Sequence, residues 1–319
     1  MTIFHYDLNK IVENHPLNKI NGIISFKKLA LSFKELEKET GRSGYGVEVG
    51  IRSLFLQFYY DLSDRQTEER LRYDIAFRWF CNFSIDDITP DHTFLCRVRK
   101  AIGTKGMGSI FRKIKKKAKK EKILRSVFSF VDASAIKVKE TTWEERDKAI
   151  KEGEEFLNNK NVGKYSADKE ARFGCKGKDK FWFGYKRHVS VDMGSGLIEK
   201  VAITPANLPD QDGLQHVCPK EKMVFGDKAY CLDKAQKTMK KNGCHSGAIF
   251  KNNMKNKNKE KDRWIARVRA PFESVFSKKE KRARYQGIAK MQLQAFMEAI
   301  VFNAKRLVTL NSPPLFAGA

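Results

Sequence analysis

The stretch SVFSFVDASAIKV (residues 126–138) decides how the rest of the chain is interpreted. Its aromatic and β-branched residues are typical of a buried strand, and strand alternation places Phe128, Phe130 and Asp132 on one face. A buried strand has no packing use for a carboxylate, and an ionised carboxylate without compensation is costly there. Asp132 is therefore the first candidate functional residue.

Two further acids stand in short signatures of their own. Asp227 ends a second apolar run, MVFGDKAY (residues 223–230), and Glu273 lies in the amphipathic stretch RVRAPFESVF (residues 267–276). Ligands gather at the carboxyl ends of strands in α/β sheets, so Asp132 and Asp227 could share an ion if their strands are neighbours. Three converging carboxylates would suit divalent metal and chemistry on phosphodiesters.

The surroundings of Glu273 leave its role open at this stage. Proline is tolerated in a first helical turn and disrupts a helix interior, so we expect a helix to begin near Pro271 with Glu273 in its first turn. Judged alone, Glu273 is better explained by a surface ion pair with Arg269, four positions earlier.

The remaining pattern of the C-terminal part predicts strands alternating with helices. We expect a hairpin of strands at 181–193 and 196–204, a short strand at 248–250, and helices at 210–218, 231–243 and 290–310. This order describes an α/β layer in which helices cover a mixed sheet. Two polar stretches do not fit it: residues 139–180 are expected to be an exposed insertion, mobile without a partner, and residues 251–263 a loop.

The N-terminal part is expected to be helical. Helices are predicted at 25–40, 47–62, 65–83 and 93–103, and Ser63-Asp64 is a candidate N-cap. The last three fit either a helix-turn-helix-like DNA-binding unit or an ordinary helical bundle. The basic run at 111–125 has two interpretations. It is either a helix or linker that follows a phosphate backbone, or a charged face that is merely solvated.

Composition narrows the class of partner. Lys and Arg number 63 against 38 Asp and Glu, a net charge of +25 that favours a nucleic acid. No apolar run approaches the roughly 18 residues of a membrane-spanning helix, and the first residues lack the order of a signal peptide. Six scattered cysteines form no C-x-x-C pair, which argues against a disulfide framework or structural zinc. We therefore expect a soluble intracellular protein.

Taken together, five segments in this order resemble the DDE transposases of bacterial insertion sequences, most closely the insertion-sequence-five group. They are residues 62–100, 130–138, 181–212, 223–230 and 267–307. Arg269 and Glu273 also fit the spacing of the Tyr-Arg-Glu-Lys signature found in related groups, whereas Ala266 and Glu280 stand where its Tyr and Lys would fall.

The resemblance implies a ribonuclease-H-like catalytic fold behind a helix-turn-helix-like N-terminal domain. It implies that Asp132, Asp227 and Glu273 form a triad that binds two Mg²⁺ ions, with Mn²⁺ as a substitute. It also implies that a homodimer cuts double-stranded DNA at terminal inverted repeats and transfers the strands, in the bacterial cytoplasm at the nucleoid. The corresponding domains are 1–125, 126–310 with the insertion 139–180, and a tail at 311–319.

Residues expected to contact DNA are basic or aromatic and lie near the three acids. They are Lys186, Lys228, Arg269, Arg282, Arg284 and Tyr285. Lys186 and His188 are two positions apart on one strand, so their side chains share a face and could point at the site together. Two alternatives share the fold: a nuclease without end specificity, and an inactive DNA-binding protein derived from a transposase.

Overall fold

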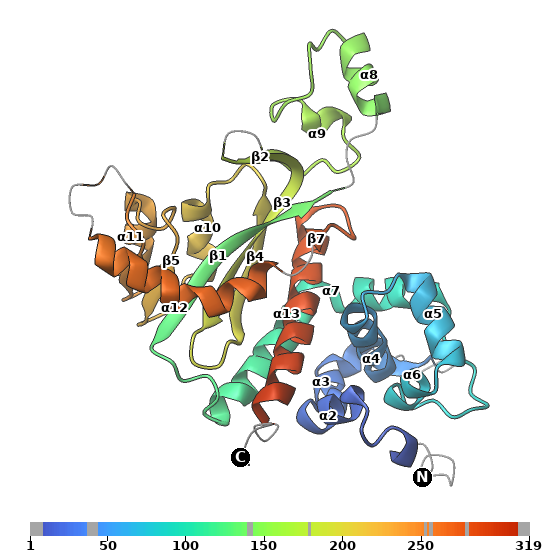
Figure 1. Ribbon diagram of the computed structural model, residues 1–319. Coiled ribbons are helices and arrows are strands. Elements are labelled where there is room, and N and C mark those ends of the chain that lie inside the picture. Colours follow the sequence, from blue (N-terminus) through green and yellow to red (C-terminus); the bar gives the residue numbers. More distant parts are fainter. Residues whose placement is uncertain are drawn as a thin grey trace. The chain divides into compact units, whose positions relative to one another are not determined.

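The computed structural model describes residues 9–36, 44–138, 143–177, 180–251, 254, 258–277 and 281–311, with the backbone alone at 143, 269, 273–277 and 281. The chain forms two compact units (Figure 1). The first falls within Met1–Lys117 and Phe296–Ala319, and the second is Ala118–Ala295. The functional division at residue 125 stays a prediction. The compact units differ from it near the C-terminus, because helix α13 (Ile288–Asn311) runs from the second unit into the first.

The first unit is helical, as predicted. Its elements are α2 (Pro16–Ile23), α3 (Phe26–Ala30), the 3₁₀-helix η1 (Leu31–Leu36), α4 (Gly46–Tyr59), α5 (Asp64–Tyr73), α6 (Ile75–Phe80) and most of α7 (His92–Lys120). The helix predicted over 25–40 is thus a short α-helix that tightens into a 3₁₀ turn, and residues 37–40 lie outside the described ranges. Across those ranges, none of the helices has the length and apolar character that crossing a membrane requires.

The helix predicted over 65–83 is two helices, each with its own side-chain cap. Ser63 begins α5 with a capping box: its Oγ accepts from the backbone N–H of Gln66 at 3.2 Å, and Gln66 Oε1 accepts from the Ser63 N–H at 2.9 Å. Asp74 then begins α6, because its Oδ1 accepts from the N–H groups of Ala76 and Phe77. The predicted cap at Ser63 is confirmed, and the second cap explains the break.

The basic run 111–125 continues the third predicted helix. That helix and residues 111–120 of the run belong to α7, which is interrupted at Gly103, where φ is +61° and ψ is 178°. Glycine adopts a positive φ without the steric penalty of a side chain, so the helix can change direction there. The interpretation of the run as a helix holds as far as Lys120, and the role of its charge stays a prediction.

A buried arginine organises the core of the first unit. Arg52 is 6% exposed, and its guanidinium lies 4.7 Å from the ring centroid of Phe26. The same guanidinium donates to the carbonyl oxygen of Phe80 at 2.9 Å and to Glu48 Oε1 at 2.9 Å. These contacts compensate the cost of burying the charge, and the rings of Phe26, Phe55 and Phe80 pack around one another.

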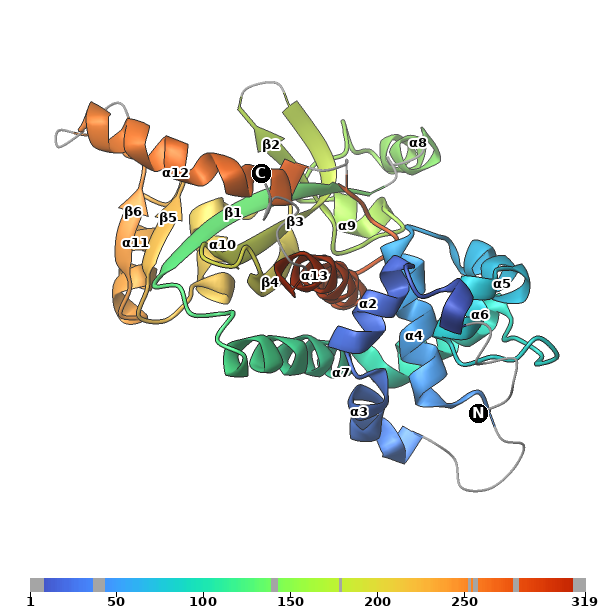
Figure 2. The ribbon, with the colours of Figure 1, turned by 60° about the horizontal axis from the view of Figure 1, so that its bottom comes forward.

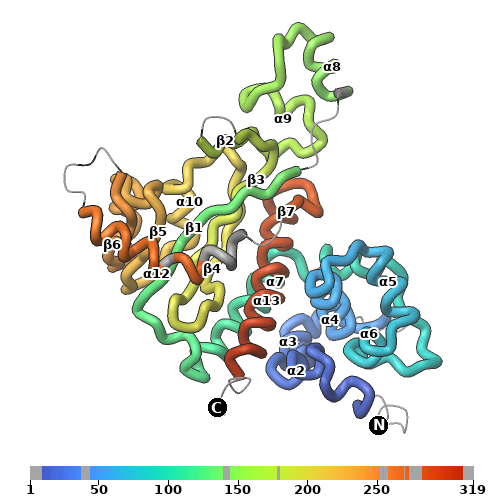
Figure 3. Tube along the Cα trace, viewed as in Figure 1, coloured from blue at the N-terminus to red at the C-terminus, as the bar shows by residue number. Residues whose placement is uncertain are grey.

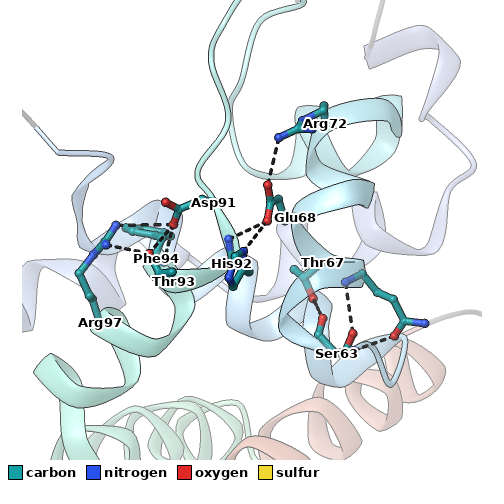
Figure 4. Close-up of polar contacts among 10 residues, drawn as sticks. Ser63, Thr67, Glu68, Arg72, Asp91, His92, Thr93, Phe94 and Arg97 are labelled. Atoms are coloured by element: carbon teal, nitrogen blue, oxygen red, sulfur yellow. Dashed lines mark hydrogen bonds and ion pairs between the residues drawn. The ribbon is translucent and has the colours of Figure 1, made fainter.

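Figure 4 shows the polar contacts that join α5 to the start of α7. Glu68 accepts from the backbone N–H of His92 at 3.0 Å, from His92 Nδ1 at 2.8 Å and from Arg72 at 3.0 Å. Asp91 caps α7, because its Oδ1 accepts from the N–H of Phe94 at 3.0 Å. Glu68 therefore fixes the first residue of α7 against α5, in the region where the sequence allowed a helix-turn-helix-like unit or a plain bundle.

Glu68→Gln is expected to lower the free energy of unfolding at pH 7 by about 1 kcal/mol, because the ionised acceptor is lost. The hydrogen bonds from His92 hold the pKa of Glu68 below its ordinary value of 4.5. Its contribution is therefore present above pH 4.5 and is lost as the pH falls through the lowered pKa. Urea unfolding at pH 7 and pH 3 should show the difference between parent and variant shrinking in acid. The exposed neighbour Glu69→Gln should match the parent at both pH values; a gap for Glu68→Gln that does not depend on pH would contradict the prediction.

The second unit is built on a seven-stranded mixed sheet. Its strands are β1 (Phe128–Lys137), β2 (Arg172–Lys176), β3 (Lys180–Asp192), β4 (Ile198–Pro205), β5 (Met223–Gly226), β6 (His245–Ala248) and β7 (Lys281–Arg282). The order is β2-β3-β1-β5-β6, with β4 beside β3 and β7 beside β1. Strands β1, β3 and β4 are antiparallel neighbours, whereas β5 runs parallel to β1 and β6 to β5. The predicted ribonuclease-H-like class, a mixed sheet flanked by helices, is confirmed. Strand β6 lies earlier than the predicted 248–250.

Helices cover both faces of this sheet, which Figures 1 and 2 show from two directions. Helix α12 (Lys259–Ser277) crosses one face, where the ring centroids of Phe272 and Phe130 lie 6.4 Å apart and those of Trp264 and Phe225 5.9 Å apart. Helices α10 (Asp210–Val217) and α11 (Asp233–Lys241) cover the other face; Val131 packs there with Leu214, Val217 and Met239. We call these the α12 face and the α10 face.

The insertion between β1 and β3 contains regular elements, which the sequence did not predict. It contains α8 (Trp143–Lys151), α9 (Val162–Tyr165) and β2, which pairs with β3 (Figure 3). Ala149, Val162 and Ala171 are completely buried. Polar side chains replace a larger apolar core here: Asn161 Nδ2, for example, donates to Glu154 Oε2 at 2.8 Å. Because such contacts involve polar side chains, the sequence of the insertion shows no hydrophobic periodicity from which its helices and strand could be predicted.

Helix α12 corrects two further expectations. It begins at Lys259, inside the stretch predicted to be a loop, and contains Pro271 within it. Residues 252–253 and 255–257 of that stretch lie outside the described ranges. Ile265 is completely buried, so packing on the sheet stabilises the helix upstream of the proline and outweighs the hydrogen bond that a proline removes.

Candidate active site

The register of the sheet places Asp132 and Asp227 side by side. In the parallel pair of β1 and β5, Phe128 lies opposite Met223 and Phe130 opposite Phe225. Each pair is separated by 95 residues (223 − 128 and 225 − 130), and so are Asp132 and Asp227 (227 − 132). The paired residues end at Phe130 and Phe225, and each acid follows its strand partner by two residues, so the register continued by one more alternation aligns Asp132 with Asp227.

Both acids belong to the α12 face. Phe130 and Phe225 contact helix α12, and each acid follows one of these residues by two positions. Strand alternation therefore gives Asp132 the face of Phe130, and the same holds for Asp227 where the chain continues from Gly226. Neither acid is exposed, and neither is fully buried. This degree of burial leaves both carboxylates accessible beside an apolar floor.

Local hydrogen bonds orient one oxygen of each carboxylate. Asp132 Oδ1 accepts from the backbone N–H of Ala133 at 2.8 Å. Asp227 Oδ1 accepts from the N–H of Ala229 at 2.8 Å and so stabilises the turn that ends β5. Gly226 is required immediately before it, because a Cβ there would lie 2.6 Å from the ring of Tyr230.

Glu273 lies on the helix that covers these acids. Its neighbour Phe272 packs against Phe130, two residues before Asp132. The backbone of Glu273 is therefore placed over the strand that carries Asp132, while its side chain and that of Arg269 lie outside the described atoms. Arg269 and Glu273 stand four positions apart on one continuous helix, not on either side of a helix start.

The structure separates Lys186 and His188 from the acids. In the antiparallel pair of β1 and β3, His188 lies opposite Ala133 and Lys186 opposite Ala135, so both belong to the α10 face. Lys186 Nζ is bound by Asp210 Oδ1 at 2.7 Å. His188 is completely buried, its Nε2 lies 2.9 Å from Thr204 Oγ1, and burial lowers its pKa to about 4. The imidazole is therefore neutral at neutral pH.

Arg187 is not among the residues that the sequence predicted for the site, yet the register places it on the face of the acids. It lies opposite Ser134, two residues beyond Asp132, and is 5% exposed. Strand alternation alone shows that Lys186 and Arg187 point to opposite faces. It does not show which face holds the acids, because that depends on the pairing of β3 with β1.

The other predicted DNA contacts lie on two segments. Lys228 directly follows Asp227 and is exposed. Arg282 is exposed on β7 and pairs with Lys137 of β1, while Arg284 and Tyr285 follow it and are half-buried. Lys137 lies five residues along β1 from Asp132, about 17 Å away, and has the parity of Ala133 and Ala135, so the register gives Arg282 the α10 face.

The donor set fits a hard divalent cation, because Asp132 on β1 and Asp227 directly after β5 offer carboxylate oxygens from two neighbouring strands. Among the described side chains, no three His, Cys, Asp or Glu residues form a group that could hold a metal ion. The third acid of the predicted triad, Glu273, is not among those side chains. The two aspartates would supply the first ligands, and α12 would supply the third.

Comparison with known proteins identifies the class of this fold and site. Residues 124–303 match the family described as the transposase DDE domain, and residues 6–101 match the transposase domain DUF772. The chain therefore belongs to the DDE transposase family, and it is a DDE-type transposase. Among solved structures, it is similar to the piggyBac transposase synaptic complex with hairpin DNA determined by cryo-EM. That similarity has 10% sequence identity over 93% of this chain and 75% of that chain, with a TM-score of 0.42.

Proposed function

We propose that this transposase cuts DNA at the ends of its mobile element and transfers the cut strands to target DNA, with Asp132, Asp227 and Glu273 as catalytic residues. The observation that supports the proposal is the separation of 95 residues that Asp132 and Asp227 share with the paired residues of β1 and β5, on the face that α12, the helix of Glu273, crosses. The element would belong to the insertion-sequence-five group, which the order of the five sequence segments supports.

The acids would act by holding divalent metal and positioning the reacting phosphate. When bound, two Mg²⁺ ions, or Mn²⁺ in their place, would supply Lewis-acid activation of the attacking oxygen and stabilisation of the leaving oxygen. Asp132 and Asp227 would fix the cations from neighbouring strands, and Glu273 from the helix above. The hydrogen bonds from Ala133 and Ala229 would keep one oxygen of each aspartate in place.

Double-stranded DNA would lie along the α12 face of the second unit. Lys228 and Arg269 would contact its backbone on this face, and Arg282, Arg284 and Tyr285 would contact it at the β7 edge of the sheet, whereas Lys186 is bound by Asp210 on the α10 face and is left out of this surface. The net charge of +25 supports a polyanionic substrate. The helical unit would bind the terminal repeats, and a homodimer would hold the two ends together at the bacterial nucleoid.

A cleavage assay tests this function. Purified protein would be incubated with a labelled duplex carrying the candidate terminal repeat, with a scrambled duplex of the same composition, and with Mg²⁺ or Ca²⁺. We expect cutting of the repeat duplex with Mg²⁺ alone. Equal cutting of both duplexes would favour a nuclease without end specificity. Binding without cutting under any metal would favour an inactive DNA-binding protein.

A further inference from the structure

A buried carboxylate outside the candidate active site ties the insertion to the start of α13. Asp168 is 2% exposed, and Tyr185, which is completely buried on β3, donates its hydroxyl to both carboxylate oxygens at 2.7 and 2.8 Å. The backbone N–H of Gly287 lies 3.3 Å from the same two oxygens. Burial and the Asp168 carboxylate raise the pKa of Tyr185, so its hydroxyl keeps its proton and remains a donor.

A second acid of the insertion binds the next backbone N–H. Glu170 Oε2 accepts from Ile288, the first residue of α13, at 2.8 Å. The first N–H groups of a helix have no partner inside it, and negative charge is favourable there. Gly287 has φ +86°, and a Cβ at this position would lie 2.9 Å from Glu170 Oε2. We call Asp168, Glu170, Tyr185 and Gly287 the insertion clamp.

The insertion clamp fixes one end of the segment 281–287, and the sheet fixes the other. Ala283 donates its N–H to the carbonyl oxygen of Lys137 on β1 at 2.8 Å. Gln294 of α13, 1% exposed, donates to the carbonyl oxygen of Arg282 at 3.0 Å and accepts from the N–H of Arg284 at 2.9 Å. In Figure 3 this segment (red) joins β7 to α13 at the end of the sheet where the insertion (green) begins.

We propose that Asp168 is a positioning residue for the transposition reaction: it holds segment 281–287 so that Arg284 and Tyr285 bind the DNA backbone at the β7 edge of the sheet that carries the acids. The inference rests on the proposed function, because it assumes that this segment contacts DNA. Asp168 is too deeply buried to touch DNA itself. A buried carboxylate that accepts from a tyrosine and a backbone amide costs desolvation, and preorganising a substrate-binding segment accounts for that cost.

Hydrogen exchange of the full chain without DNA tests the placement directly. In Asp168→Asn, amides of residues 281–290 should exchange about 10-fold faster or more than in the parent, while those of β4 keep their protection. The matched control is Glu152→Gln, because Glu152 accepts from Tyr165 at 3.1 Å and from Lys164 within the insertion alone. This control should leave residues 281–290 unchanged. Unchanged exchange at 281–290 in Asp168→Asn would overturn the inference. If that variant does not fold, Tyr185→Phe takes its place in the experiment, because it removes one hydrogen-bond donor to Asp168 and keeps the carboxylate.

A double-mutant cycle tests the link to the reaction. On a cleavable end duplex at saturating DNA, Asp168→Asn should lower the cleavage rate about 10-fold. In the Arg284→Ala background the same change should cost less than about 2-fold, because residues acting through one another are not additive. Equal losses in both backgrounds would show that Asp168 stabilises the fold generally and would sink the inference. A parent that cuts no end duplex would contradict the proposed function, and the exchange experiment would still decide whether the clamp exists.

Discussion

Asp227→Asn is expected to reduce the rate of DNA cleavage by about a thousandfold or more while leaving the affinity for end DNA within about threefold. Loss of a single well-placed electrostatic group at a reaction centre costs about 10²–10³ in rate, and here the substitution removes the charge of a proposed cation ligand. The turn after β5 should survive, because asparagine retains an oxygen that can accept from Ala229 as Asp227 does. Single-turnover cleavage and a gel-shift titration would measure the two quantities separately.

The matched control for this variant lies on the other face of the same unit. Asp212 is also half-buried and carries an ion pair with the largely exposed Lys234 at 3.2 Å. Such a surface pair contributes little, so Asp212→Asn should cut at the parent's rate within about twofold. An Asp227→Asn enzyme that still cut end DNA at the parent's rate would remove Asp227 from the catalytic residues and with it the proposed triad.

Gly184→Ala is expected to destabilise the second unit by about 3 kcal/mol, the largest effect on stability that we predict. A Cβ at Gly184 would lie 2.2 Å from the carbonyl oxygen of Ile136 and 2.9 Å from the nitrogen of Val138. Both atoms belong to the backbone, which cannot move aside without breaking the pairing of β1 with β3. The φ of +149° adds strain for any residue with a side chain.

Urea unfolding of the full chain would measure this change as a lower midpoint. Gly177→Ala separates the steric clash from the backbone strain. Gly177 also has a positive φ, +75°, but nothing lies within 4 Å of an added Cβ. We expect that control to cost only about 1 kcal/mol from backbone strain. Equal midpoints for the two variants would show that the close approach to β1 does not determine the effect.

Local patterns in the sequence were sufficient to predict most elements of the fold. Alternating apolar residues predicted β1, β3 and β4, and helical spacing predicted α4, α10, α11 and α13. The site residues Asp132 and Asp227 were selected because carboxylates at the ends of apolar strands are costly. The conclusion that these strands are neighbours needed the register, since nothing local links residues 95 positions apart.

The errors share one physical cause, which is that long-range contacts outweigh local preference. Pro271 predicted a helix start, yet Ile265 is completely buried and Trp264 packs against Phe225 of β5, so α12 extends upstream of the proline. Polar residues predicted an insertion without elements of its own, yet it contains two helices and a strand, supported by hydrogen bonds among its Asn and Glu side chains and by the pairing of β2 with β3; its mobility without a partner stays a prediction. Lys186 was assigned to the site because alternation defines two faces and cannot say which face α12 will cover.

The course of α13 has a consequence for how the protein is made. Phe296 of α13 packs against Phe111, with ring centroids 5.8 Å apart, and Lys305 lies 4.0 Å over the ring of Tyr59. The N-terminal helices therefore cannot complete these contacts until the last residues of the chain have been synthesised. The second unit, Ala118–Ala295, is synthesised in full before those last residues. During translation the catalytic half would fold ahead of the half that begins the chain. A message cut short near its 3′ end would yield a protein whose first domain is unfinished.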